Sequence, residues 1–155
     1  MKYVIGYFLF VLYFLQELLN IKIEYIENLQ SIESYKKWSG LVLLLLILWQ
    51  WVVSLNRTNK LLKNTTKEKF IEIHKWIGLL LPIAFYMHSS NFGFGILLLL
   101  SIVFFVNILL GIINSENILD KKPKFYNIWL MLHIVLSVLI VALSINHLWQ
   151  VFYYN

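Results

Sequence analysis

The stretch YNIWLMLHIVLSVLIVALSINHLWQVFY, residues Tyr126–Tyr153, contains no aspartate, glutamate, lysine or arginine. A helix crosses the hydrocarbon core of a bilayer with roughly 20 mostly apolar residues. The stretch is long enough to do so. Because backbone polar groups in lipid must be satisfied inside the segment, the pattern predicts a membrane-spanning α-helix.

Four further apolar blocks precede this stretch. They cover Tyr3–Leu19, Trp38–Leu55, Phe70–Ser89 and Phe92–Ile113. The alternation over about 10 residues that is typical of a transmembrane β-strand is absent. We therefore expect an all-α fold, an integral membrane bundle of five transmembrane helices that forms one domain over residues 1–155. The segment Asn20–Lys37 is expected to be a polar loop.

Composition and charge support the same class. Hydrophobic residues make up 60% of the chain and charged residues only 14%, whereas soluble domains carry about 25% charged residues. The net charge of +5 does not indicate nucleic-acid binding, because the basic residues lie in short loops between spans. Lysine-rich and arginine-rich loops stay in the cytoplasm. The basic loops Asn56–Lys69 and Ser115–Phe125 thus predict an inside amino terminus and an outside carboxyl terminus.

The abundance of isoleucine, leucine, lysine and asparagine favours an AT-rich bacterium, and hence its cytoplasmic membrane with lipid as a partner. The chain has no cysteine. This excludes disulfides, thiolate metal sites, iron–sulfur clusters and covalently attached c-type haem. Any cofactor must be held by histidine or by shape.

The four histidines fall in the third and fifth apolar blocks. His74 and His88 are 14 residues apart, and so are His133 and His147. Fourteen residues make nearly four turns, so each pair shares a helix face, with roughly 21 Å between its members along the axis. The two helices run in the same direction in the predicted topology. His74 therefore shares the inner depth with His133, and His88 shares the outer depth with His147.

Two facing histidines at each depth favour haem over other metal groups. Zinc usually takes four protein ligands, or three and a water, and no cysteine or matched carboxylate is near. A porphyrin supplies four equatorial nitrogens and needs only two axial ligands. The pattern thus predicts two haem b groups with iron bound by histidine. Small residues one turn from each histidine give clearance for the macrocycle or simply let helices approach: Gly78, Ala84, Ser137 and Ser144.

Other residues within the blocks have weaker interpretations. Glu17, Gln50 and Asn107 are isolated polar residues, for which we expect hydrogen bonds between helices. Phe85 lies between the two histidines of its block, in the interval that electrons would cross. No motif for nucleotide binding, hydrolysis or hydride transfer occurs, and we assign no catalytic residue.

The spacing His74-x13-His88 and His133-x13-His147, on the third and fifth spans, resembles the ferric-reductase-like transmembrane cytochromes, a superfamily that includes the NADPH oxidases. The resemblance covers about residues 69–150. It implies that His74 and His133 bind an inner haem, and that His88 and His147 bind an outer one. The expected organisation departs from that of the larger enzymes, because these 155 residues show no sixth apolar block and no motif of a flavin- and nicotinamide-binding domain.

These features predict a cytochrome that conducts electrons across the membrane. The donor would be a separate protein or a quinone, and the sequence identifies no acceptor. Whether the chain is itself an oxidoreductase enzyme stays open. One alternative is a haem-bearing anchor subunit of a quinone-linked redox complex. Another is a helical scaffold or transporter without haem, in which the histidines form hydrogen bonds between helices.

Overall fold

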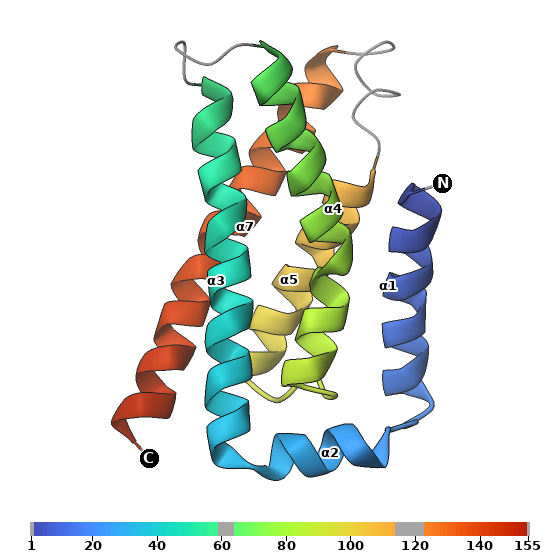
Figure 1. Cartoon of the computed structure of the whole chain (residues 1–155), viewed down its shortest axis with the longest axis vertical. Helices are drawn as coiled ribbons and strands as arrows, with labels where there is room; N and C mark the ends of the chain where they lie inside the picture. The colour runs from blue at the N-terminus through green and yellow to red at the C-terminus, as the bar shows by residue number, and fades with distance from the viewer. Residues whose placement is uncertain (1, 59–63, 114–122, 155) are drawn as a thin grey trace. The chain divides into compact units, whose positions relative to one another are not determined.

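The protein is all-helical in the residues that its computed structural model describes, which are 2–58, 64–113 and 123–154. No strand occurs in these ranges, so the expected all-α class is confirmed. Six helices are described (Figure 1): α1 (Lys2–Leu18), α2 (Glu24–Ser31), α3 (Glu33–Thr58), α4 (Asn64–His88), α5 (Ile96–Ile112) and α7 (Pro123–Tyr153). The two basic loops used to predict orientation lie partly or mostly outside the described residues.

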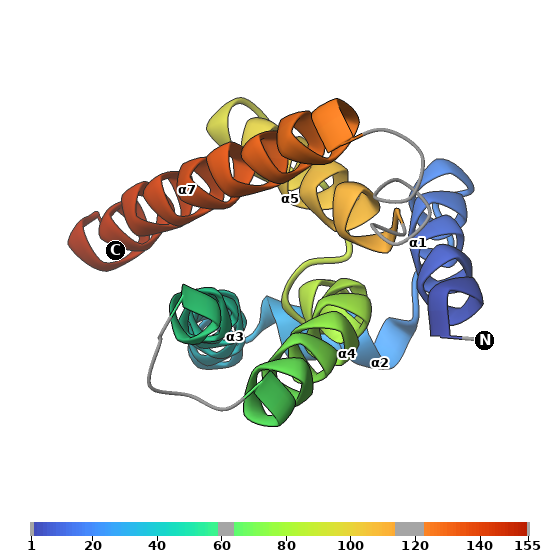
Figure 2. The same ribbon diagram turned by 90° about the horizontal axis from the view of Figure 1, so that it is seen from above.

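The chain divides into two compact units, Met1–Asn91 and Phe92–Asn155. In the first unit, α4 contacts α1, α2 and α3, and α3 and α4 lie side by side (Figure 2). The short helix α2 joins α1 to α3 at the end of the unit where α4 finishes (Figure 1). In the second unit, α5 packs along α7. Phe104, Phe105 and Ile108 of α5 are buried.

The prediction of a polar loop over Asn20–Lys37 is wrong, because α2 and the first residues of α3 lie in this segment. Asn20 has a φ of 51°, a left-handed conformation that asparagine tolerates better than most residues. It lets the chain turn after α1. Glu24 and Glu27 then lie in the first turn of α2, where carboxylates interact favourably with the helix dipole.

Two described helices are long and apolar enough to cross a membrane, Thr65–His88 and Phe125–Tyr153. Val4–Leu18 and Ile96–Ile112 are shorter apolar helices. Length and composition therefore support two of the five predicted spans. A bundle of five spans goes beyond this finding.

Candidate functional site

The histidines of α4 both face α3. The side chain of His74 lies against the backbone of Gln50. At the other end of α4, Nδ1 of His88 lies 3.2 Å from Oγ of Ser39. These contacts run in opposite directions along the two helices, so α3 and α4 are antiparallel. They also show that His74 and His88 share one face of α4.

The ring of His88 lies directly against the backbone of α3. A Cβ atom added to Gly40 would lie 2.8 Å from Cε1 of His88 and 3.2 Å from its Nδ1. Real Cβ atoms almost never approach another atom so closely. The observed position of the ring therefore requires glycine at residue 40.

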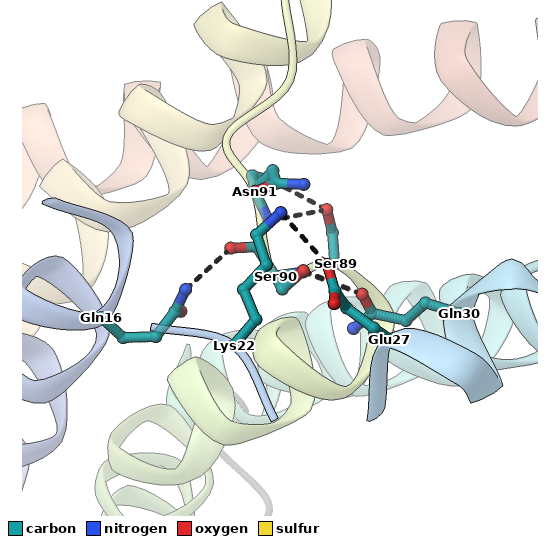
Figure 3. A network of polar contacts seen from close by, with 7 residues as sticks. All are labelled: Gln16, Lys22, Glu27, Gln30, Ser89, Ser90 and Asn91. Carbon is teal, nitrogen blue, oxygen red and sulfur yellow. Dashed lines mark hydrogen bonds and ion pairs between the residues drawn. The ribbon is translucent and has the colours of Figure 1, made fainter. Parts of the chain in front are cut away.

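The end of α4 that carries His88 is held by Gln30 of α2 (Figure 3). Nε2 of Gln30 donates to the Tyr86 carbonyl at 2.7 Å. Its Oε1 accepts from the backbone N–H of Ser90 at 3.2 Å and from the Ser90 hydroxyl at 3.0 Å. The last four carbonyls of a helix have no partner within it. Gln30 donates a hydrogen bond to one of these carbonyls, and its bonds with Ser90 tie the following turn to α2.

Helices α1 and α3 add further donors at the same end of α4. Gln16 of α1 donates to the Ser90 carbonyl at 3.3 Å (Figure 3). The Tyr35 hydroxyl of α3 donates to the Met87 carbonyl at 3.1 Å. Three different helices thus fix the turn in which His88 lies.

The middle of α4, between its two histidines, is open at the small residues. Pro82 lies inside the helix and has no N–H to donate, which removes the bond to the carbonyl of Gly78. A Cβ atom at Gly78 would meet no atom within 4 Å. Ala84 lines an apolar hollow of about 330 Å³. Phe85 is buried, and its ring packs edge-on against Tyr13 of α1 with centroids 5.5 Å apart.

In the second unit, His133 lies beside the last turn of α5. Its ring is parallel to that of Trp129, with an interplanar angle of 4° and centroids 5.9 Å apart. A Cβ atom on Gly111 of α5 would be in ordinary contact with Cε1 of His133 at 3.5 Å. Nε1 of Trp129 donates to the Leu110 carbonyl at 2.8 Å. Trp129 therefore holds both α5 and the face of the His133 ring.

Ser137 joins α7 to α5. Its hydroxyl donates to the His133 carbonyl at 2.7 Å and accepts from Nδ2 of Asn107 at 3.1 Å. The expected helix–helix bond of Asn107 is thereby confirmed. At this residue the small side chain has a bonding role between helices, whereas Gly78 has open space around it.

The remaining two predicted residues of α7 are placed by register. Gly111 lies beside His133, and Asn107 beside Ser137, so α5 and α7 are antiparallel. Ser144 and His147 lie further along α7, beyond the contacts of Asn107, Leu110 and Gly111 with that helix. Ser144 and His147 are both half-buried.

Each unit thus brings together the histidine environment of one helix. The predicted ligand pairs, His74 with His133 and His88 with His147, join residues of different units and stay predictions. Among the described residues, no group of three or more histidine, cysteine, aspartate or glutamate side chains could hold a metal ion. A haem with two histidine ligands needs no such group.

Sequence reasoning missed Ser39, Gly40 and Gln30. The pair Ser39 and Gly40 stands at the start of an apolar block, and two adjacent small residues there could have indicated a close contact. Gln30 gave no signal, because its partners lie 56 and 60 residues further along the chain.

The comparisons with known proteins give no match: no protein-family model, curated protein or solved structure is similar to this chain.

Proposed function

We propose that the protein is a membrane b-type cytochrome that carries two haems, each held by two histidines, and conducts electrons across the bilayer. One observation carries the proposal. The chain has four histidines, and all of them lie on the two described helices that are long and apolar enough to cross a membrane. Their spacing on both helices is the same. Ionisable residues in a span are costly and by default functional.

The residues present fit this group. Nδ1 of His74 and Nδ1 of His133 are buried, and both residues are half-buried as a whole. Open space at Gly78 and the apolar hollow at Ala84 lie between the two histidines of α4. An imidazole nitrogen to bind the iron, with apolar surface on the same helix for the macrocycle, is what each helix must supply to a haem held by two histidines.

In this proposal, His74 and His133 hold the inner haem and His88 and His147 hold the outer one. Bound haem iron supplies one-electron chemistry by alternating between its ferrous and ferric states. The chain's own residues orient the ligands and exclude water around them. The protein crosses a bacterial cytoplasmic membrane five times, with its amino terminus inside. Electrons enter from a separate protein or a quinone.

A second function is favoured by a specific observation. The contacts of His74 with the backbone of Gln50 and of His88 with Ser39 both join α4 to α3. Histidines used in this way would suit a helical scaffold without haem. In model systems such bonds contribute about 0.6 to 2 kcal/mol each.

An absorption spectrum and a pyridine haemochrome assay of the purified full chain separate the two functions. The cytochrome should show two haems b per chain. His74→Ala and His133→Ala should each remove the same haem, and His88→Ala and His147→Ala the other. Asn146→Ala, an exposed polar change beside His147, should keep both. If the purified protein contained no haem, the scaffold function would be favoured. Loss of one shared haem from His74→Ala and His88→Ala would disprove the assignment by depth.

Vesicles of known orientation test conduction. An impermeant reductant on one side should reduce an impermeant acceptor on the other through the intact protein. The transfer should stop in His88→Ala. Equal transfer in both would favour a haem-bearing anchor subunit.

A further inference from the structure

Among the described residues, two polar atoms lie within hydrogen-bond distance of the Ser39 hydroxyl. Its Oγ lies 3.2 Å from the Lys36 carbonyl oxygen and 3.2 Å from Nδ1 of His88. A hydroxyl has one proton to donate, and a carbonyl oxygen can only accept. Only one arrangement makes both contacts favourable. The hydroxyl proton goes to the Lys36 carbonyl, and Oγ accepts a proton from Nδ1 of His88.

This arrangement determines where the ring proton of His88 lies. A neutral imidazole has one N–H and one nitrogen with a lone pair. With the proton on Nδ1, the lone pair lies on Nε2. The nitrogen of a histidine that binds a metal is set by the hydrogen bond that the other nitrogen makes.

We propose that Ser39 and Gly40 of α3 are positioning residues for His88, orienting its ring so that Nε2 is the atom that binds the outer haem iron. The inference rests on the proposed function, because it needs His88 to be a ligand. Ser39 fixes the tautomer through the Nδ1–H bond. Gly40 fixes the plane of the ring, because the side chain of any larger residue there would occupy the space that the His88 ring fills.

The close fit at Gly40 is not shared by Gly78, the glycine that follows the other histidine of α4 by one turn. Three atoms of the His88 ring, Cε1, Nδ1 and Nε2, would lie between 2.8 and 3.4 Å from an added Cβ. At Gly78 on α4, an added Cβ would meet nothing within 4 Å. The α3 backbone at residue 40 thus acts as a flat surface for the imidazole.

The hydrogen bond should also influence the redox potential. An acceptor at Nδ1–H raises the electron density of the ring and makes Nε2 a stronger donor. A stronger donor stabilises ferric iron and lowers the potential of that haem. Removing the acceptor should therefore raise the potential of the outer haem. The effect should be modest, because a hydroxyl oxygen is a weaker acceptor than a carboxylate.

The test uses the full chain with its haems, titrated by optical redox potentiometry and measured by electron paramagnetic resonance of the ferric low-spin signals. Ser39→Ala should shift one of two midpoint potentials upward and change the resonance of that haem alone. Ser39→Thr keeps a hydroxyl and should restore both values. Ser34→Ala, an exposed serine on the same helix, is the matched control and should change neither.

Gly40→Ala should displace the ring and reduce the haem content from two per chain to one, or strongly alter the same resonance. In a His147→Ala background, where only the inner haem is expected, Ser39→Ala should have no effect. If two haems bind and neither signal responds to Ser39→Ala or Gly40→Ala, the inference fails while the proposed function stands. A wild-type chain without haem overturns both.

Discussion

Helices α4 and α7 carry histidines at the same spacing but are held in different ways. Helix α4 contacts three other helices of its unit, and polar side chains from all three bind its carboxyl end. Helix α7 packs on α5 within its unit. It is longer and more apolar, and most of its large apolar residues are exposed. The comparison shows that one histidine pattern can be supported by polar neighbours or by an apolar helix that suits lipid.

The sequences of the two helices explain the difference. Helix α4 contains Pro82, which removes one of its own hydrogen bonds, and it includes Glu72 and Lys75 within its span. Such a helix is stabilised by hydrogen bonds from side chains of neighbouring helices. The apolar span of α7, Phe125–Tyr153, has neither proline nor charge, so its backbone bonds are satisfied internally.

The largest expected difference between the two helices concerns their carboxyl ends. Gln30→Ala removes the bond to the Tyr86 carbonyl and the two bonds to Ser90. It should lower the free energy of unfolding by about 3 kcal/mol, since each net hydrogen bond contributes about 1 kcal/mol. The measurement is unfolding in detergent, followed by circular dichroism.

Gln150→Ala on α7 is the matched control, because Gln150 only donates to Asn146 at the exposed surface. Its effect should stay within about 0.5 kcal/mol. Equal losses in the two variants would contradict the view that α4, and not α7, depends on polar support at its end.

The two glycines beside the α4 histidines should respond in opposite directions. In the haem-free chain, Gly78→Ala should stabilise the protein by about 0.4–1 kcal/mol, because alanine reduces the freedom of the unfolded chain and meets no neighbour. Gly40→Ala should destabilise it by about 1–3 kcal/mol, the usual effect of overpacking.

Thermal unfolding of both variants shows whether each stabilises or destabilises the chain. The haem content of the same variants gives a second difference between the two glycines. If Gly78 gives clearance to the inner macrocycle, Gly78→Ala should weaken inner haem binding while it stabilises the haem-free chain. A stable Gly40→Ala chain would show that the His88 ring moves aside at little cost.

The sequence predicted the helical class and located five of the six described helices, with ends that differ from the observed bounds by up to six residues. It could do so because apolar blocks longer than 16 residues are a local signal. Helix α2 was missed because it has only eight residues, and these are neither clearly apolar nor clearly polar on average. A helix that short is stabilised mainly by contacts that residues far away provide, here those of Gln30 with the end of α4.

Within the candidate site, the shared face of His74 and His88 followed from periodicity alone, and the structure places both against α3. The identity of their neighbours could not be predicted. Ser39 and His88 are 49 residues apart, and a shift of one residue between α3 and α4 would have brought a different side chain to the ring. The pairing of histidines across α4 and α7 depends on the same kind of non-local register and stays a prediction.

A smaller effect is expected where α5 and α7 meet. Asn107→Ala and Ser137→Ala each remove the bond between the two side chains. In a double-mutant cycle the coupling should be about 0.6 kcal/mol, the average for such bonds between membrane helices. Denaturant titration of the four proteins measures it. A coupling near zero would mean that α5 and α7 are held by apolar contact alone.

The smallest effect should come from a charged pair at the start of α3, outside the predicted span. Lys37 donates to the carboxylate of Glu33, and this hydrogen bond, aided by the charge of Lys37, lowers the pKa of Glu33 below its usual value. A lowered carboxyl pKa means that the pair favours the folded state above the pKa of the unfolded chain. That contribution is lost as the pH falls through the lowered pKa. Because Glu33 is fully exposed, salt should screen the effect.

Nuclear magnetic resonance titration of the Glu33 carboxyl should give a lowered pKa in the wild type and an ordinary one in Lys37→Met. Asn146 and Gln150 form an uncharged pair of the same spacing on α7. The effect of Gln150→Ala on the free energy of unfolding should therefore not depend on pH or salt. An unchanged Glu33 titration in Lys37→Met would show that this surface pair, unlike the polar cap of α4, does not persist in solution.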